Sequence, residues 1–228
     1  EADVAALFEH HPLTSMKPAI LTLLTLCIIT FSAASLELNT ELFTFIQKRF
    51  GTEAVDRLQQ WEKIANSNKN TNNTNKLKLV NTFFNKAKFI SDIKHWGKED
   101  YWATPLELLA TNGGDCEDYS IAKYFTLREM GVPIEKMKIT YVKAVKLNQA
   151  HMVLAYYSEP DAEPLILDNL INDIKPASMR DDLVPVYSFN GEGLWLSKIR
   201  GQEGKRIGSA DKLKNWQDLL TRQHNLME

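Results

Sequence analysis

The hydrophobic pattern of this chain changes its period once, near Pro133, and this change constrains the fold more than any other feature. Before Pro133, apolar residues recur at the three- and four-residue spacing of amphipathic helices, as in residues 38–46, 55–61 and 80–87. After it, short β-branched and aromatic runs alternate with turn residues. A set of helices followed by a set of antiparallel strands is typical of an α+β domain.

The expected elements place one helix at the centre of that domain. The sequence predicts a helix over 116–130, which Gly131 and Pro133 end. Two polar segments, 66–75 and 201–208, are expected to be an exposed loop and a connector. Strands are expected over residues 137–146, 151–158, 165–170, 184–190 and 194–198, and a last helix over about 210–223.

The first residues resemble an export signal. Met16 and Lys17 precede an apolar run, 19–31, and small residues follow it up to Ser35. The run is well short of the roughly 20 residues that a membrane-spanning helix needs. We therefore expect residues 1–34 to be an upstream segment and a signal peptide cleaved after Ala34. Residues 35–228 would then be a single exported domain without a stable membrane anchor.

Export would leave one thiol in the chain. Residues 1–34 contain Cys27, so Cys116 is the only cysteine of the remaining part and cannot form an internal disulfide. Because a lone thiol in an oxidising compartment is open to oxidation, it calls for a chemical role. Cys116 is expected in the first turn of the central helix, where unpaired N–H groups favour a thiolate. The alternative, a small buried hydrophobe, fits poorly with its acidic neighbours.

A nucleophilic thiol also needs a base. Residues 35–228 contain three histidines, His95, His151 and His224. His151 opens an apolar strand and is therefore placed to face a cleft, although a half-exposed strand end is an equally ordinary fate. His95, in a turn-like stretch, is the weaker candidate. Asp168 interrupts another apolar strand, and a carboxylate there is costly unless it is paired.

A hairpin would bring these two residues together. If residues 158–161 form a four-residue loop, Tyr157 pairs with Ala162 and His151 lies opposite Asp168 on the same face of the sheet. Directly opposed side chains have Cβ atoms about 4.5–5.5 Å apart, close enough for a hydrogen bond that orients the imidazole. The residues thus suggest a nucleophile on a helix, with its base and orienting carboxylate on adjacent strands.

Three carboxylates flank the cysteine. Asp115, Glu117 and Asp118 would raise the pKa of a thiol beside them. A bound Ca²⁺ would offset these charges, since it prefers oxygen ligands. Helix capping, with Asp115 as the N-cap, is the plainer explanation, and no EF-hand pattern is present. From the residues alone, both interpretations stay open.

Three segments and a fourth upstream of them carry a family resemblance. Residues 114–119, 151–154 and 167–170, preceded by the sequence Tyr-Trp-Ala-Thr-Pro at 101–105, resemble the bacterial transglutaminase-like cysteine proteinases. The resemblance implies a transglutaminase-like or papain-like α+β fold, with the central helix packed on an antiparallel sheet. It implies a catalytic triad of Cys116, His151 and Asp168. It also implies Ca²⁺ bound by Asp115, Glu117 and Asp118.

The resemblance further implies a function. A member of this kind would be a calcium-dependent periplasmic endopeptidase that cuts a large cell-surface adhesin at a di-alanine site in its N-terminal region. Release of the adhesin would disperse biofilm, and an inner-membrane cyclic-di-GMP receptor would restrain the protease. The same triad could instead serve amide acyl transfer or hydrolysis of peptidoglycan peptides. A third possibility is a binding module with a disused site, but the complete set of Cys, His and Asp argues against it.

Composition bears on one further class of partner. The chain is 44% hydrophobic and 25% charged, with a formal net charge of −2, which are ordinary globular values. It has no conspicuous stripe of lysine and arginine. We therefore do not expect nucleic acid to be a partner.

Overall fold

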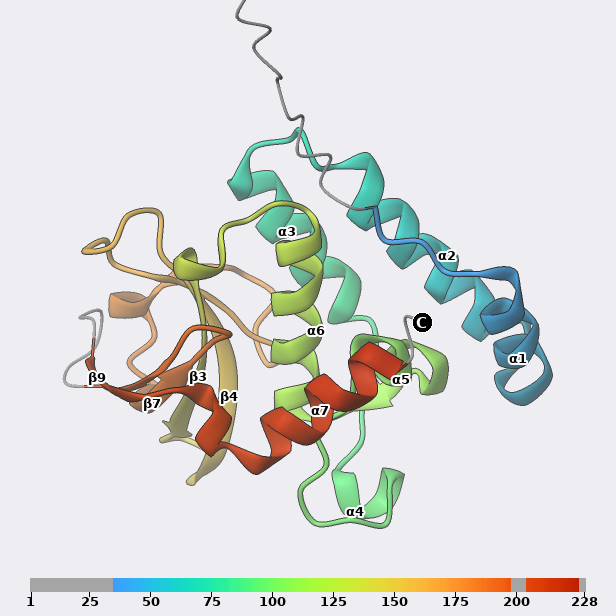
Figure 1. Cartoon of the computed structure of the whole chain (residues 1–228). Coiled ribbons are helices and arrows are strands. Elements are labelled where there is room, and N and C mark those ends of the chain that lie inside the picture. Colours follow the sequence, from blue (N-terminus) through green and yellow to red (C-terminus); the bar gives the residue numbers. More distant parts are fainter. Residues whose placement is uncertain (1–34, 198–203, 226–228) are drawn as a thin grey trace, which may run out of the picture. The chain divides into compact units, whose positions relative to one another are not determined.

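The helix α6 (Cys116–Glu129) forms the centre of the computed structural model (Figure 1). Every residue from Asp118 to Leu127 is buried, because α6 is covered on several sides. It packs against strands β3 (Met137–Ala144) and β4 (Gln149–Tyr156) of the sheet and against helices α2 (Thr52–Ser67), α3 (Asn73–Phe84) and α5 (Pro105–Thr111). A helix enclosed in this way is a core element, and its first turn carries Cys116.

The structure describes residues 35–197 and 204–225. The predicted signal segment, 1–34, lies outside the described residues. The described part belongs to one compact unit, Ala33–Glu228. None of its helices combines the length and the apolar character needed to cross a membrane. The division of the chain at Ala34 stays a prediction.

Three helices form the first half, as the periodicity predicts, although the third begins before the predicted range of about 77–90 and ends earlier, at Phe84. They are α1 (Thr40–Phe50), α2 (Thr52–Ser67) and α3 (Asn73–Phe84). The predicted loop over 66–75 is confirmed for residues 68–72 and wrong at its two ends, because α2 extends to Ser67 and α3, capped by the side chain of Asn72, begins at Asn73. Asparagine is a favoured N-cap, so a run of asparagines can mark a helix start. Phe45, expected on the apolar face of α1, is 57% exposed.

Short elements that the periodicity did not reveal lead into α6. They are β1 (Lys88–Phe89), α4 (Asp92–His95), α5 (Pro105–Thr111) and β2 (Gly113–Gly114). Strands β1 and β2 pair in parallel. Helix α5 begins with a capping box between Thr104 and Glu107. These contacts fix the two glycines that precede Asp115 and the cysteine.

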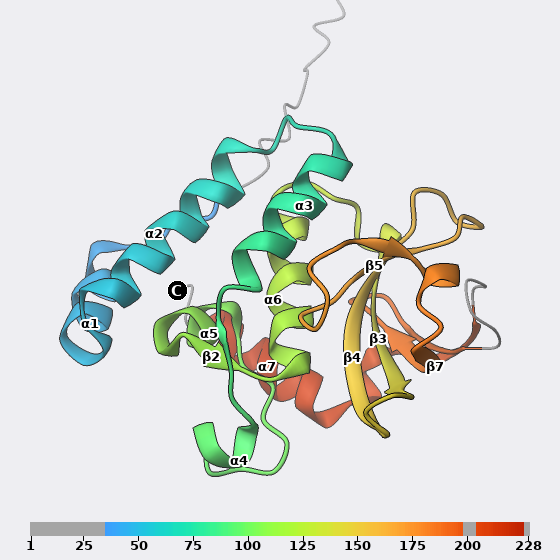
Figure 2. The ribbon, with the colours of Figure 1, turned by 180° about the vertical axis from the view of Figure 1, so that it is seen from behind.

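An antiparallel sheet of seven strands forms the second half, in the order β6-β5-β4-β3-β7-β8-β9. Figure 2 shows β4 and β5 beside α3 and α6. Strand β9 occupies part of the predicted connector 201–208, which is therefore wrong for its described residues. The strands are β3 (Met137–Ala144), β4 (Gln149–Tyr156), β5 (Leu165–Leu167), β6 (Lys175–Pro176), β7 (Leu183–Phe189), β8 (Leu194–Leu196) and β9 (Lys205–Gly208).

Three 3₁₀ turns and a last helix complete the fold: η1 (Ile134–Lys136), η2 (Ala177–Met179), η3 (Ala210–Lys212) and α7 (Lys214–Asn225). Apolar residues of α6, such as Phe125, share one core with Leu154 of β4 and Phe189 of β7. The predicted α+β class is confirmed, with the helix that carries the cysteine packed on an antiparallel sheet.

The register between β4 and β5 differs from the predicted hairpin. Leu154 pairs with Leu167 and Tyr156 with Leu165, so the connecting loop is longer than four residues. Extended by one residue, this register sets Asp168 opposite Val153, two residues from the predicted partner His151. A shift of two residues leaves each side chain on its original face of the sheet, whereas a shift of one would have reversed it. His151 and Asp168 are therefore diagonal neighbours.

Gly114 is expected to tolerate no side chain. A Cβ built there would lie 2.4 Å from Oδ2 and 2.9 Å from Cβ of Asp118, and 2.9 Å from Cδ1 of Leu108. Gly114→Ala should therefore lower the free energy of unfolding by about 1–3 kcal/mol, measured by urea denaturation. Gly191→Ala is the matched control, because its Cβ would meet only the Tyr124 hydroxyl at 3.4 Å. Equal stability of the two variants would contradict this account.

Candidate active site

Cys116 is the first residue of α6, and a buried carboxylate fixes its position. Asp118, two residues further on in the same turn, is fully buried. Its Oδ2 accepts a hydrogen bond from the N–H of Asp115 at 3.0 Å, and its Oδ1 accepts one from the N–H of Ala103 at 2.7 Å. The first turn of α6 is thereby tied to the segment that precedes α5.

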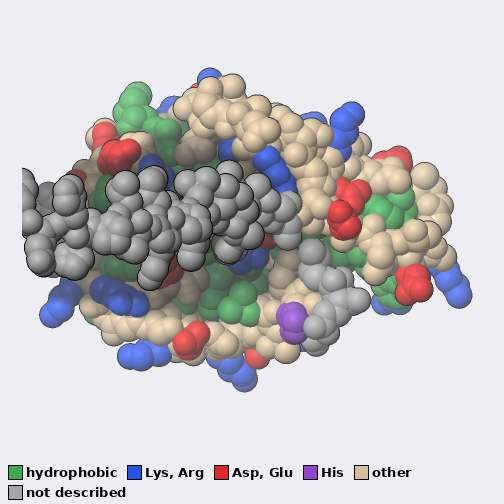
Figure 3. Space-filling view, turned by 45° about the horizontal axis from the view of Figure 1, so that its top comes forward, with side chains coloured by type: hydrophobic (Ala, Val, Ile, Leu, Met, Phe, Trp, Pro, Cys, Tyr) green, Lys and Arg blue, Asp and Glu red, His purple; other side chains and the backbone are tan. Residues whose placement is uncertain are grey.

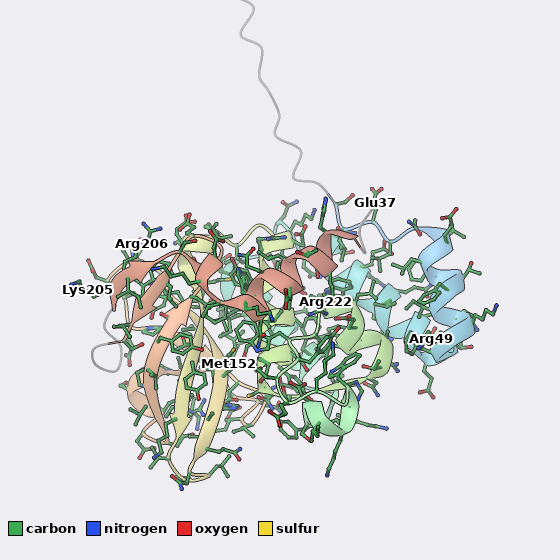
Figure 4. The ribbon with its side chains drawn as sticks, turned by 60° about the horizontal axis from the view of Figure 1, so that its bottom comes forward. Glu37, Arg49, Met152, Lys205, Arg206 and Arg222 are labelled. Atoms are coloured by element: carbon green, nitrogen blue, oxygen red, sulfur yellow. The ribbon has the colours of Figure 1, made fainter. Side chains whose placement is uncertain are left out.

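The half-buried thiol lies where the helices meet the sheet. The backbone N–H of Met152 points at it from β4, one residue after His151. Figure 4 labels Met152 and shows it at this junction. The thiol itself donates a hydrogen bond to Oε2 of Glu117 at 3.0 Å. Burial, then the charge of Glu117, raises the pKa of Cys116, and the Met152 N–H opposes these effects only in part.

His151 and Asp168 form a buried pair. Nε2 of His151 lies 2.8 Å from Oδ1 of Asp168, and the two residues are 3% and 1% exposed. The backbone N–H of Leu170 also donates to Oδ1, at 3.0 Å. Burial by itself would raise the pKa of Asp168, but the hydrogen bonds from His151, Leu170 and Arg180 outweigh it and hold the pKa at about 2. The carboxylate is ionised, so Nε2 of His151 carries the proton that the hydrogen bond needs.

Two buried cations accompany this pair, and neither was predicted. Nη2 of Arg180 donates to Oδ2 of Asp168 at 2.7 Å. Lys123 of α6 is 1% exposed, and burial lowers its pKa to about 7 while the charge of Asp168 opposes that shift. The sequence offers little signal for either residue, because a single arginine in a loop or a single lysine in a helix is ordinarily a surface residue.

The other histidines lie in different environments. Nε2 of His95 is 2.8 Å from the hydroxyl of Thr111, and the ring packs edge-on against Trp96. Burial lowers the pKa of His95. His224 is an exposed residue near the end of α7. Nε2 of His151 contacts a buried carboxylate, that of Asp168, and this contact favours His151 as the base.

Four acidic side chains besides Asp118 converge near the cysteine. Carboxylate oxygens of Asp92, Asp100 and Glu117 lie within 4.8 Å of one another, and so do those of Asp92, Asp115 and Asp118. Asp92 and Asp100 come from the α4 region, over a dozen residues before the cysteine. The metal ligands expected from the sequence are Asp115, Glu117 and Asp118 alone, because these three lie in one contiguous motif.

This acidic cluster contains oxygens that have no protein donor. Oδ1 of Asp92 and Oδ1 of Asp115 are buried and accept no hydrogen bond from the described residues. Burial raises the pKa of Asp92 to about 6, and burial together with Glu117 raises that of Asp115 to about 8. Unpartnered oxygens among crowded carboxylates are what a hard cation such as Ca²⁺ prefers as ligands. The residues present therefore fit a calcium ion.

The last helix, α7, contacts the segment of Tyr101 and Trp102, which lies next to the acidic cluster. Arg222 of α7, labelled in Figure 4, donates to the hydroxyl of Tyr101 at 2.7 Å and to the carbonyl of Trp102 at 2.6 Å. The N–H of Tyr101 in turn donates to Oδ2 of Asp92. Helix α7 thus helps to position the segment that supplies part of the cluster.

One face of the molecule carries charges of both signs. The face in Figure 3 carries acidic and basic side chains side by side, without a broad patch of one sign among its described residues. The exclusion of nucleic acid as a partner stays a prediction.

Because Asp168 has a pKa of about 2 in the folded chain and about 3.9 when unfolded, its charge stabilises the fold above pH 4. That contribution, roughly 2 kcal/mol, should be lost as the pH falls from about 4 through about 2. Asp168→Asn should flatten the pH dependence of the unfolding free energy in this range. Asp161→Asn, in the exposed β4–β5 loop, should keep the wild-type dependence. An unchanged slope in Asp168→Asn would contradict the ionised pair.

The chain is similar to known proteins in sequence and in structure. Residues 45–195 match the family described as bacterial transglutaminase-like cysteine proteinase. A solved structure of LapG from Legionella pneumophila is 40% identical, with a TM-score of 0.70, and the match covers 84% of this chain and 98% of that one. Its calcium-bound form is 41% identical, with a TM-score of 0.68, covering 82% and 99%.

An EGTA-treated form of the same protein is also 41% identical, with a TM-score of 0.70, covering 84% of this chain and 98% of that one. A search of curated protein sequences gave no match. The family match covers more than half of the chain, and the solved structures match most of it. The chain is a cysteine protease that belongs to the bacterial transglutaminase-like cysteine proteinase family.

Proposed function

We propose that this protein is a calcium-dependent periplasmic endopeptidase in which Cys116, His151 and Asp168 act as nucleophile, base and orienting carboxylate. The observation that carries the proposal is the buried 2.8 Å contact between His151 and Asp168. The residue after His151 on strand β4, Met152, directs its backbone N–H at the thiol. A Cys-His-Asp set on a helix start and two strands is the arrangement that acyl transfer through a thioester needs.

The geometry assigns a separate task to each ring nitrogen. Nε2 of His151 is bound to Asp168, so Nδ1 is the nitrogen left to take the thiol proton and to return it to the leaving amine. Cys116 would attack the peptide carbonyl, the amine would depart with that proton, and water would then hydrolyse the thioester. Backbone N–H groups in the first turn of α6 have no acceptor within the helix and can donate to the carbonyl oxygen as it becomes negative.

Calcium would be held by Asp92, Asp115 and Glu117, with Asp100 beside them. Asp118 is the remaining predicted ligand, and it also accepts hydrogen bonds from the backbone of Asp115 and Ala103. Support comes from the unpartnered oxygens of Asp92 and Asp115 and from the similarity to a calcium-bound LapG structure. A bound ion would supply positive charge next to the thiol, where the carboxylates otherwise oppose a thiolate. Glu117, whose Oε2 accepts a hydrogen bond from the thiol, belongs to the same carboxylate cluster.

The substrate and setting follow from the family resemblance. We propose a large cell-surface adhesin as the substrate, cut in its N-terminal region so that it is released and biofilm disperses. An inner-membrane cyclic-di-GMP receptor would be the regulator that restrains the protease in the periplasm. The 40% identity to LapG over most of both chains supports this assignment over the other reactions of the same triad.

Substitutions in the triad should abolish cleavage of a purified adhesin N-terminal fragment, followed by gel electrophoresis with added Ca²⁺. Cys116→Ala should remove the activity. His151→Ala and Asp168→Ala should each reduce kcat by several orders of magnitude, and the double variant should be little worse than the weaker single one, because the residues act as a unit.

His95→Gln is the matched control for the base. His95 contacts Thr111, so its loss should leave kcat within a few-fold of the wild type. If His95→Gln were inactive and His151→Ala were active, the triad assignment would be contradicted. Cleavage by Cys116→Ala would sink the thiol mechanism, and cleavage confined to peptidoglycan peptides would move the substrate to another class.

Calcium should raise the melting temperature of the wild type, because only the folded chain gathers these carboxylates. The measurement is differential scanning calorimetry in EGTA and then in excess Ca²⁺, with Mg²⁺ as the weaker competitor because it demands a tighter octahedral site. Asp92→Asn and Asp115→Asn should each reduce the Ca²⁺-dependent rise in melting temperature. Both should also bind Ca²⁺ more weakly, as measured by isothermal titration calorimetry.

Asp211→Asn is the control, since this exposed aspartate of η3 lies outside the cluster and contacts Ser209 and Gln217. It should keep the full Ca²⁺ response. If Asp92→Asn responded to Ca²⁺ as the wild type does, the α4 region would not contribute to the site. An identical melting temperature in EGTA and Ca²⁺ would return the acidic cluster to a purely structural role.

A further inference from the structure

A buried arginine lies behind the His151–Asp168 pair, and the mechanism above does not use it. Arg180 follows the turn η2 and is 1% exposed. Its Nη2 donates to Oδ2 of Asp168 at 2.7 Å and to Oδ2 of Asp182 at 2.9 Å, while Nε donates to Oδ1 of Asp182 at 2.9 Å. One guanidinium therefore binds two carboxylates, one of which is the partner of His151.

The two oxygens of Asp168 are divided between different donors. Oδ1 faces His151 and the N–H of Leu170, and Oδ2 faces Arg180. A carboxylate can rotate about its terminal bond, and rotation would remove Oδ1 from the imidazole. With a donor fixed on each oxygen, that rotation is blocked. Asp182 holds Arg180 at a second point by a two-pronged contact, so the guanidinium plane is itself fixed.

Arg180 is poorly explained as a device for stability alone. Its Nη1 is buried and has no hydrogen-bond partner among the described residues, which costs free energy. A buried ion pair is often matched or exceeded in stability by apolar residues of similar size. A cation that leaves one donor unused, yet presents another to the carboxylate of the triad, fits a role in shaping the site.

We propose that Arg180 is a positioning residue of the active site, whose guanidinium holds the carboxylate of Asp168 in the orientation that hydrogen-bonds His151. The inference rests on the proposed function for its effect on turnover, but its effect on the His151–Asp168 contact is independent of any substrate. The charged groups that face Asp168 are His151 from β4, Lys123 from α6, and Arg180, which Asp182 anchors.

The test is proton NMR of the full chain labelled with ¹⁵N-histidine. The Nε2 proton of His151, held by Asp168, should give a signal far downfield that is absent in Asp168→Asn. In Arg180→Met this signal should broaden or vanish. Any remaining signal should disappear, as the pH is lowered, at a higher pH than in the wild type, because Asp168 has lost a cation that keeps it ionised. Arg180→Lys should restore the signal in part, since a lysine supplies the charge without the fork.

Turnover of the adhesin fragment gives the second measurement. Arg180→Met should lower kcat by about 10- to 100-fold, as loss of an outer hydrogen-bond partner of a site residue typically does, and should change KM by less. Lys76→Met is the matched control. Lys76 is another buried cation, but its Nζ donates to the carbonyl of Met130 at the far end of α6. The Lys76→Met variant should be less stable than the wild type but should keep the His151 Nε2 proton signal and the wild-type kcat.

Arg180→Met with a wild-type signal, pH dependence and kcat would overturn the proposal. Should that variant not fold, Asp182→Asn decides, because it loosens Arg180 and leaves the contact to Asp168 in place. It should weaken the signal, and a wild-type signal would again overturn the inference. If the wild type fails to cut the fragment, the proposed function fails, while the NMR result still decides the role of Arg180.

Discussion

The fold around the nucleophile depends on one buried carboxylate, that of Asp118. Its two oxygens accept backbone hydrogen bonds from Asp115 and from Ala103, so it joins the start of α6 to the segment before α5. Burial raises the pKa of Asp118, and a polar group this deeply buried is tolerated only when its oxygens are occupied. The same carboxylate fills the space next to Gly114, which explains why the chain has no Cβ there. Cys116 owes its place on the first turn to this tie.

Opposite charges are separated on the two sides of the site. Near the thiol, the acidic side chains of two segments crowd together, and their burial raises the pKa values of Asp92 and Asp115. Behind His151 the balance is reversed, because Asp168 is surrounded by donors and cations and its pKa is held at about 2. The acidic side needs a cation from solution to favour a thiolate, whereas the carboxylate that orients the imidazole needs none. The His151–Asp168 pair is thus complete without an added ion, whereas the carboxylates near the thiol call for a bound cation.

Much of the site was visible in the sequence because local chemistry marks it. A lone cysteine after two glycines at a helix start, and a histidine and an aspartate in apolar strands, are signals that periodicity and residue type carry. The hairpin register was wrong by two residues, yet His151 and Asp168 meet, because an even shift preserves the face of a strand. The loop predicted from asparagines is shorter than predicted, because asparagine also caps helices.

The sequence by itself determined the α+β class, the order of helices before strands, and the nucleophile with its base and orienting carboxylate as candidates. It did so because period, capping and burial cost act over a few residues. Only the tertiary structure brought Asp92 and Asp100 to the cysteine and set Arg180 behind Asp168. These contacts join segments far apart in the chain, and no local pattern encodes them. They arise when α6 packs on the sheet and fixes which loops meet at its first turn.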